Sequence, residues 1–105
     1  MDKTDAINIA QKYASAVIGN FNFKKMILFG SYAKGNYNEN SDIDIAIVFN
    51  DFSNLIDMQL ELMKLRRKID SRIEPHPFRE RDFDISNPIV NEIVKYGQEI
   101  TFNVD

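Results

Sequence analysis

The chain has 105 residues, of which 44% are hydrophobic and 28% are charged. This length suits one domain, and the composition is that of a soluble globular protein rather than a disordered or fibrous one. The longest apolar run, residues 45–49, is far shorter than the roughly 20 residues that a membrane-spanning helix needs. The acidic N-terminus fits neither a signal peptide nor a transit peptide, so we expect a cytoplasmic protein with no membrane contact.

Cysteine is absent and His76 is the single histidine. This excludes a disulfide framework, a thiolate nucleophile and a cysteine or histidine-cluster zinc site, so any metal must be bound by oxygen. Thirteen basic and sixteen acidic side chains give a net charge of -3. A negative charge opposes the counterion release that drives sequence-independent nucleic-acid binding, and we therefore expect no direct DNA binding.

The first half of the chain predicts one helix and two buried strands. Apolar residues recur at helical spacing between Thr4, a candidate N-cap, and Gly19, a helix stop. The segment Lys25–Phe29 is short and apolar, and residues 42–49 are rich in β-branched side chains, as expected of strands. A single helical turn at Ser31–Lys34 follows the first strand.

The second half predicts two further helices. One is capped by Asp51 or Ser53 and extends to about Asp70, and it carries an apolar stripe that predicts packing against the sheet rather than a coiled coil. The stripe consists of Leu55, Met58, Leu62, Leu65 and Ile69. The last helix opens near Ser86 or Asn87 with Pro88 in its first turn, and it stops at Gly97.

Two short strands complete the predicted sheet. Residues 71–76 predict a strand that Pro75 and Pro77 bring to an end, because proline cannot donate to the sheet ladder. Residues 99–104 predict a terminal strand. The alternation of helices and strands predicts an α/β domain.

Asp42 and Asp44 are candidate metal ligands. Alternate residues of a strand project from one face about 7 Å apart, so the two carboxylates point together while the neighbouring isoleucines fill the opposite face. Two like charges repel unless a cation lies between them, and oxygen ligands favour Mg²⁺ or Mn²⁺. An isolated Asp-x-Asp is more often a solvated strand end, so this pair alone is weak evidence.

Gly30 and Ser31 supply the second half of a larger pattern. Glycine allows a ligand to approach the backbone closely, and free N–H groups beside a serine hydroxyl suit phosphate oxygens. Ten residues separate Ser31 from Asp42. Gly-Ser followed at one fixed distance by Asp-x-Asp arises by chance in about one chain per thousand of this length, so the spacing is informative.

In the context FGSYAKGNYNENSDIDIAIVF, this motif resembles the signature of the DNA polymerase β-type nucleotidyltransferase superfamily, and the chain resembles its minimal nucleotidyltransferase (MNT) members. The resemblance implies one MNT domain over residues 1–105, with a mixed β-sheet flanked by helices. It also implies that Gly30 and Ser31 hold the triphosphate of ATP, and that Asp42 and Asp44 ligate two Mg²⁺ ions, for which Mn²⁺ could substitute.

The resemblance calls for a third carboxylate, and Asp70 and Glu74 are the candidates. We choose Glu74 because it lies on the polar face of a predicted strand, whereas Asp70 lies at a helix end; the family more commonly carries aspartate here. Lys34 stands where related sequences often have arginine, and it is either a point charge on phosphate or a solvent-facing lysine. His76 is a possible general base, but a lone histidine is usually structural, and we leave it out of the catalytic set.

The resemblance implies a metal-dependent transfer of AMP from ATP to a hydroxyl of a macromolecular acceptor. MNT proteins are often antitoxins of HEPN-domain ribonuclease toxins, which some of them adenylylate on a tyrosine. We therefore expect a HEPN toxin as partner and a hetero-oligomer. Two alternatives stay open: an antitoxin that acts by contact alone, and a nucleotidyltransferase subunit of a two-chain enzyme that modifies small molecules.

Overall fold

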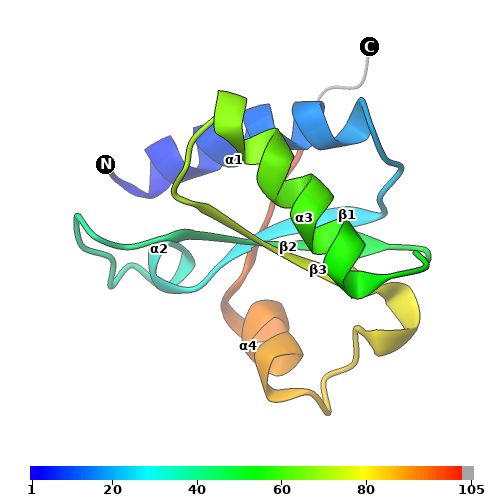
Figure 1. Cartoon of the computed structure of the whole chain (residues 1–105). Coiled ribbons are helices and arrows are strands. Elements are labelled where there is room, and N and C mark those ends of the chain that lie inside the picture. The colour runs from blue at the N-terminus through cyan, green and yellow to red at the C-terminus, as the bar shows by residue number, and fades with distance from the viewer. Residues whose placement is uncertain (103–105) are drawn as a thin grey trace.

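The computed structural model describes residues 1–102, which form a four-stranded mixed β-sheet between helices (Figure 1). The strands lie in the order β3-β2-β1-β4. The central strands β1 (Lys25–Phe29) and β2 (Ile43–Phe49) are antiparallel, and β2 runs parallel to β3 (Ile73–Arg79). The short β4 (Gln98–Glu99) pairs antiparallel with β1. The predicted α/β class, with a mixed sheet flanked by helices, is confirmed.

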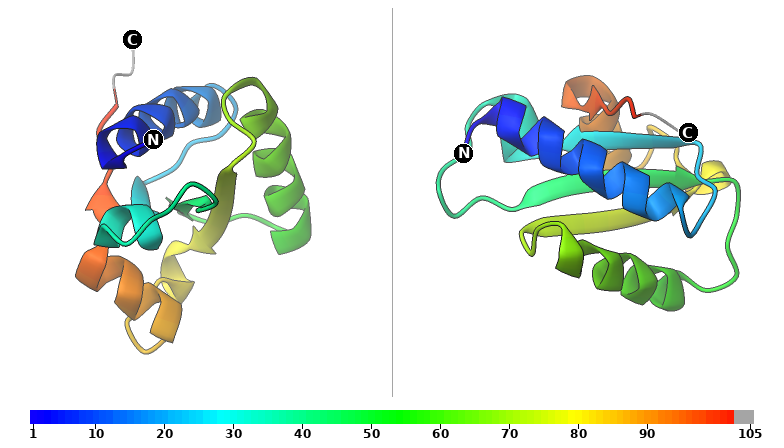
Figure 2. Two further views of the ribbon diagram at one scale, coloured as in Figure 1. Left: turned by 90° about the vertical axis from the view of Figure 1, so that its left-hand side faces the viewer. Right: turned by 90° about the horizontal axis from the view of Figure 1, so that it is seen from above.

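Helices cover both faces of this sheet (Figures 1 and 2). The helices α1 (Lys3–Ile18) and α3 (Leu55–Leu65) lie on one face, and α4 (Pro88–Tyr96) lies on the other. The single turn α2 (Ser31–Lys34) follows directly on β1. No helix within residues 1–102 is long and apolar enough to cross a membrane.

The alternation of side chains along β2 separates a core face from a site face. Ile43, Ile45 and Ile47 are fully buried in the main core, together with residues of α1 and α3. Ala46 belongs to a smaller cluster on the opposite face, where Ile93 of α4 packs. Because successive side chains point to opposite faces, Asp44 lies on the same face as Ala46, the face that α4 covers only in part.

The first helix begins two residues earlier than predicted. Asp2, not Thr4, is the N-cap: its Oδ1 accepts from the Asp5 N–H at 2.9 Å, while Asp5 Oδ2 accepts from the Asp2 N–H at 3.0 Å. This reciprocal capping box satisfies two backbone donors, which one threonine hydroxyl could not do. The predicted stop at Gly19 is correct.

The long helix is shorter than predicted at both ends. Its N-cap is Asn54, whose Oδ1 accepts from the Asp57 N–H at 3.0 Å, and α3 ends at Leu65 before a separate 3₁₀ turn, η1 (Arg66–Lys68). Leu62 of the apolar stripe is fully buried, and Met58, Leu65 and Ile69 pack against the core. Leu55, the first residue of the stripe, is 51% exposed, so its predicted packing against the sheet is wrong.

Strand β3 continues through both prolines to Arg79, so the prediction that they end it is wrong. The reason is its position at the edge of the sheet, where one row of donors has no strand partner. Gln59 of α3 donates its side-chain N–H to the Pro75 carbonyl at 2.9 Å. The predicted terminal strand is reduced to β4, and its predicted end at Val104 lies outside the described residues.

Candidate active site

The turn after β1 has a backbone shape that requires glycine. Gly30 has φ 74° and ψ -151°, and it is followed by the four residues of α2, which Gly35 closes at φ 86°. An L side chain is strained at such positive φ values. Ser31, the first residue of α2, is partly exposed, and the sequence-predicted phosphate cradle therefore lies at the surface.

This turn lies against the acidic strand. Phe29 pairs with Asp44 between β1 and β2, and a Cβ added to Gly30 would overlap the Asp44 carboxylate at Oδ2. The missing side chain thus provides the space in which that carboxylate lies. The two halves of the Gly-Ser…Asp-x-Asp pattern, separated along the chain, are in direct contact in the fold.

Three acidic residues lie on or directly before the neighbouring strands β2 and β3. Asp42 directly precedes β2 and is exposed, and Asp44 lies within the strand. Glu74 is the parallel-register partner of Asp44, so the two side chains leave the sheet on the same face. Glu74 Oε2 lies 3.6 Å from Arg66 Nη1, which also donates to the Ile73 carbonyl at 2.8 Å.

Asp70, the other candidate for the third acid, has a local structural role. It accepts from the backbone N–H and the Nε of Arg72, both at 2.9 Å, and from Nη2 at 2.7 Å. The Arg72 side chain holds the pKa of Asp70 below its usual value. Asp70 lies before β3, in the turn that precedes it, and has no strand register with Asp44.

His76 lies beside Asp44, a relationship that sequence reasoning missed. Its Nε2 is 3.2 Å from Asp44 Oδ1, and its ring packs edge-on against Phe29 with centroids 5.0 Å apart. His76 and Glu74 are separated by one residue of β3, so both lie on one face of the strand. Only the parallel register of β2 with β3 brings this histidine to Asp44, and no local sequence signal reports that register.

Lys34 reaches toward α4. Its ammonium forms an ion pair with Glu92, which raises the pKa of Lys34, and lies over the Tyr96 ring at 5.1 Å from the centroid. The lysine therefore links α2 to α4 at the edge of the site. Lys34 is an exposed residue that also pairs with Glu92, so both the solvent-facing interpretation and the phosphate role stay open.

The donor set suits hard divalent cations. Asp44 and Glu74 offer carboxylate oxygens on one face of the sheet, and Asp42 directly precedes β2; Mg²⁺ and Mn²⁺ prefer such oxygen ligands. Within residues 1–102 no three acidic or histidine side chains already form a closed metal cluster. Asp44 contacts His76 and Glu74 contacts Arg66, so the residues fit a metal after these side chains turn from their present partners.

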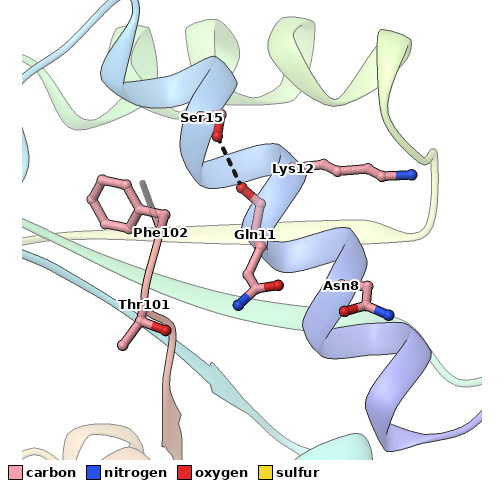
Figure 3. A pocket seen from close by; sticks show the side chains of 6 residues that line it. All are labelled: Asn8, Gln11, Lys12, Ser15, Thr101 and Phe102. Carbon is pink, nitrogen blue, oxygen red and sulfur yellow. Dashed lines mark hydrogen bonds between the residues drawn. The ribbon is translucent and has the colours of Figure 1, made fainter. Parts of the chain in front are cut away.

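Two hollows lie on the surface of the described chain. The first, about 520 Å³, lies along α1 beside the C-terminal stretch, and Figure 3 shows that polar side chains such as Gln11 and Lys12 line it. It contains none of the predicted site residues. The second, about 450 Å³, includes His76 and therefore adjoins Asp44.

The comparison with protein families decides what this arrangement is. The model of the nucleotidyltransferase domain family matches residues 11–100. The chain belongs to this family. The match includes the Gly30-Ser31 turn, both aspartates of the acidic strand and Glu74. The predictions that the chain is an enzyme of the nucleotidyltransferase class and an MNT-type member are confirmed.

Two relatives come from Methanocaldococcus jannaschii. "Putative protein adenylyltransferase MJ0141" is 33% identical over 79 residues, which cover 72% of this chain and 77% of that protein. "Putative protein adenylyltransferase MJ0604" is 58% identical over 41 residues, which cover 38% of this chain and 41% of that protein. The similarity to these proteins supports a nucleotidyltransferase activity for the chain.

Solved structures share the fold. A "putative nucleotidyltransferase" from Sulfolobus solfataricus has a TM-score of 0.66 at 24% identity, with 92% of this chain and 80% of that chain covered. The toxin-antitoxin MntA-HpeT has a TM-score of 0.63 at 26% identity, with coverage of 88% and 71%. A toxin-antitoxin with AMP-PNP has a TM-score of 0.62 at 25% identity, with coverage of 98% and 75%.

Proposed function

We propose that residues 1–105 form one MNT domain that transfers AMP from ATP to a hydroxyl of a partner protein. The observation that carries the proposal is the register of Asp44 with Glu74, directly beside the Gly30 turn. This register supports Glu74 as the third carboxylate beside Asp44, and the close approach of Gly30 supports the adjoining turn as the phosphate site. We assign Asp42, Asp44 and Glu74 to the catalytic site, and Gly30, Ser31 and Lys34 to the triphosphate.

The transfer is an in-line substitution at the α-phosphorus of ATP. The acceptor oxygen forms the new bond to phosphorus, the bond from phosphorus to the bridging oxygen breaks, and pyrophosphate leaves while the hydroxyl proton passes to solvent. Two Mg²⁺ or Mn²⁺ ions, held by the three carboxylates, would neutralise the phosphates and polarise the acceptor. Positioning and charge supply most of such catalysis, so a small domain suffices.

Within this scheme each side chain has a distinct task. The backbone N–H groups after Gly30 and the Ser31 hydroxyl donate to phosphate oxygens, which a short turn at the surface leaves accessible. Lys34 adds a positive charge when its ammonium exchanges Glu92 for phosphate. Glu74, on the edge strand β3, is the carboxylate that we assign to the acceptor side of the site.

The proposed partner is a HEPN-domain toxin, with a tyrosine as the acceptor, in a complex of two kinds of chain. Two similar solved structures are toxin-antitoxin pairs, and one of them contains AMP-PNP. The curated relatives are named as protein adenylyltransferases. These names support a protein acceptor, and they support ATP as the nucleotide.

The direct test is label transfer from α-³²P-ATP to the co-purified partner in the presence of Mg²⁺ or Mn²⁺. Wild type should label the partner, and both EDTA and the double substitution Asp42→Asn with Asp44→Asn should abolish labelling. Because asparagine keeps the size of aspartate, circular dichroism should show an unchanged fold. A partner labelled equally by the double variant would refute the assignment.

Antitoxin action by contact alone is the second candidate. It is supported by the two similar solved structures that are toxin-antitoxin pairs, since contact alone can neutralise a toxin in such a pair. The same double variant separates the two functions in cells that express the toxin. A contact antitoxin protects the cells without transfer, whereas a catalytic antitoxin loses protection together with labelling.

A further inference from the structure

The second hollow is an apolar groove formed by three elements. We call it the acceptor groove, and it is about 450 Å³ in volume. It is lined by the first turns of α3, by β3 and by the start of α4: Leu55, Ile56, Gln59, Leu60, His76, Pro77, Phe78 and Ile89. This size is within the range of about 300–1,000 Å³ that ligand pockets occupy, so it accommodates a few side chains rather than a whole interface.

The groove brings together several large aliphatic side chains that are exposed to solvent. Ile56 is 70% exposed, Leu60 54% and Leu55 51%, whereas Leu62 of the same helix is fully buried. Ile89 of α4 faces the same groove and is 37% exposed. A contiguous exposed apolar surface of this kind, rather than scattered single residues, marks an interaction site.

The lining selects an apolar occupant. No lysine, arginine, aspartate or glutamate lines the groove, so it offers nothing to the phosphates of a nucleic acid. The side-chain N–H of Gln59 is already donated to the Pro75 carbonyl. Pro75 and Pro77 lack the N–H groups that a partner strand would need at this edge, so the occupant binds by side chains rather than by strand addition.

The groove is continuous with the carboxylates. His76 lines it and also contacts Asp44, with Nε2 at 3.2 Å from Oδ1. His76 is separated from Glu74 by a single residue of β3, so a chain that lies over Pro77 and Phe78 passes the site within one or two residues. An occupant of the groove therefore presents its neighbouring residues to the transfer site.

We infer that the acceptor groove binds the acceptor polypeptide itself, by aliphatic side chains that flank the modified tyrosine. This inference rests on the proposed function for the identity of the acceptor. The groove contributes selection of the protein substrate, which the carboxylates and the phosphate cradle do not provide. The groove therefore raises the transfer rate to apolar-flanked tyrosines over polar-flanked ones.

The test uses two synthetic peptides and ¹⁵N NMR of the full chain. In one peptide leucine and isoleucine flank a tyrosine, and in the other serine and glutamine do, with the same soluble ends. The apolar peptide should shift the backbone amides of the groove on α3 and β3, and the polar peptide should not. Chemical-shift changes confined to amides outside the groove, or no changes at all, would overturn the inference. Changes at the groove that depend on protein concentration and not on the peptide would also overturn it, because they would report binding of a second copy of the chain.

Matched variants locate the effect. Ile56→Gln with Leu60→Gln should weaken binding of the apolar peptide about tenfold or more, because two apolar contacts are lost. Val94→Gln changes an apolar residue of α4 that is 58% exposed and outside the groove, and should leave binding unchanged. Amide dispersion reports the fold of each variant. Equal peptide affinity of the double variant and wild type would refute the groove.

Transfer assays with the same peptides separate this inference from the proposed function. With α-³²P-ATP, wild type should prefer the apolar peptide about tenfold in kcat/KM, and the Ile56→Gln, Leu60→Gln variant should lose the preference but retain ATP binding. If the peptide changes the chemical shifts of the groove amides but AMP is transferred to no polypeptide, the proposed function is refuted and the groove remains an apolar peptide-binding site. Transfer that is indifferent to the flanking residues and to the double variant refutes the groove alone.

Discussion

Gly30 packs so closely against Asp44 that a methyl group at position 30 would overlap the carboxylate oxygen Oδ2. The two residues belong to different halves of the site, the phosphate turn and the acidic strand. Because they are in contact, a shift of the turn that is proposed to bind the triphosphate would also move the Asp44 carboxylate that is proposed to bind the metal. The spacing between Ser31 and Asp42 in the sequence is the length of loop that joins two antiparallel strands at this contact.

This contact yields a prediction with an internal control. Gly30→Ala should lower the free energy of unfolding by about 3 kcal/mol, because it combines a forbidden backbone conformation with overlap at Asp44. Gly35→Ala should lower the free energy of unfolding by only about 1 kcal/mol. Its φ of 86° strains an alanine, but an added Cβ meets no atom within 4 Å. Urea unfolding measures both, and label transfer should fall much further in Gly30→Ala. Equal losses in the two variants would contradict the account.

A second prediction concerns the Lys34–Glu92 ion pair. Lys34→Gln should raise the KM for ATP, because it removes the positive charge proposed for phosphate. Glu92→Gln breaks the same pair but keeps the ammonium, so it should leave the KM unchanged or lower it. Kinetics at varied ATP concentration make the comparison, and a similar rise in KM in both variants would show that Lys34 only holds α4.

The same pair predicts a stability change in alkaline solution. The Glu92 carboxylate raises the pKa of Lys34 above its usual value, so the pair stabilises the fold fully below the unfolded pKa. Its contribution is lost as the pH rises through the folded pKa. Glu92→Gln should therefore unfold more readily than wild type at neutral pH, and the difference should shrink in strongly alkaline buffer.

The pKa of Asp70 gives the opposite pH dependence. Hydrogen bonds from Arg72 lower this pKa, so the pair stabilises the fold above the unfolded value of about 3.9 and its contribution is lost as the pH falls through the folded value. Asp70→Asn should cost about 1 kcal/mol at pH 7, since the group is partly exposed. Urea unfolding at several pH values checks this, and a difference from wild type that is independent of pH would contradict it.

The elements that the sequence predicts best are those with local signals. The apolar periodicity of α1 and the β-branched run of β2 each identify an element from adjacent residues. The continuation of β3 beyond Pro75 could not be predicted, because it depends on β3 being an edge strand. Likewise, the exposure of Leu55 depends on how α3 packs against the sheet, which its own residues do not report.

The residues of the candidate site also divide into those that local sequence signals predict and those that depend on the tertiary structure. The Gly30-Ser31 turn and the Asp42/Asp44 pair are visible because one loop of fixed length joins them. Glu74 could be ranked above Asp70 only from an expected strand. The contacts of His76 with Asp44 and of Lys34 with Glu92 join segments far apart in sequence, and they follow from strand register and helix placement.

The central claim is that Glu74, in register with Asp44, completes the catalytic carboxylates. The most direct measurement is the single-turnover rate of AMP transfer to the partner at saturating ATP, compared between Glu74→Gln and Asp70→Asn, with ATP affinity measured by calorimetry. Glu74→Gln keeps the size of the side chain but removes its charge, so the rate should fall by about 100-fold or more with little change in ATP affinity. Asp70→Asn should stay within about twofold of wild type, as expected of a substitution outside the site. A wild-type rate in Glu74→Gln would contradict the account. A large loss of rate in Asp70→Asn alone would also contradict it, and would place the third carboxylate before β3 rather than within it.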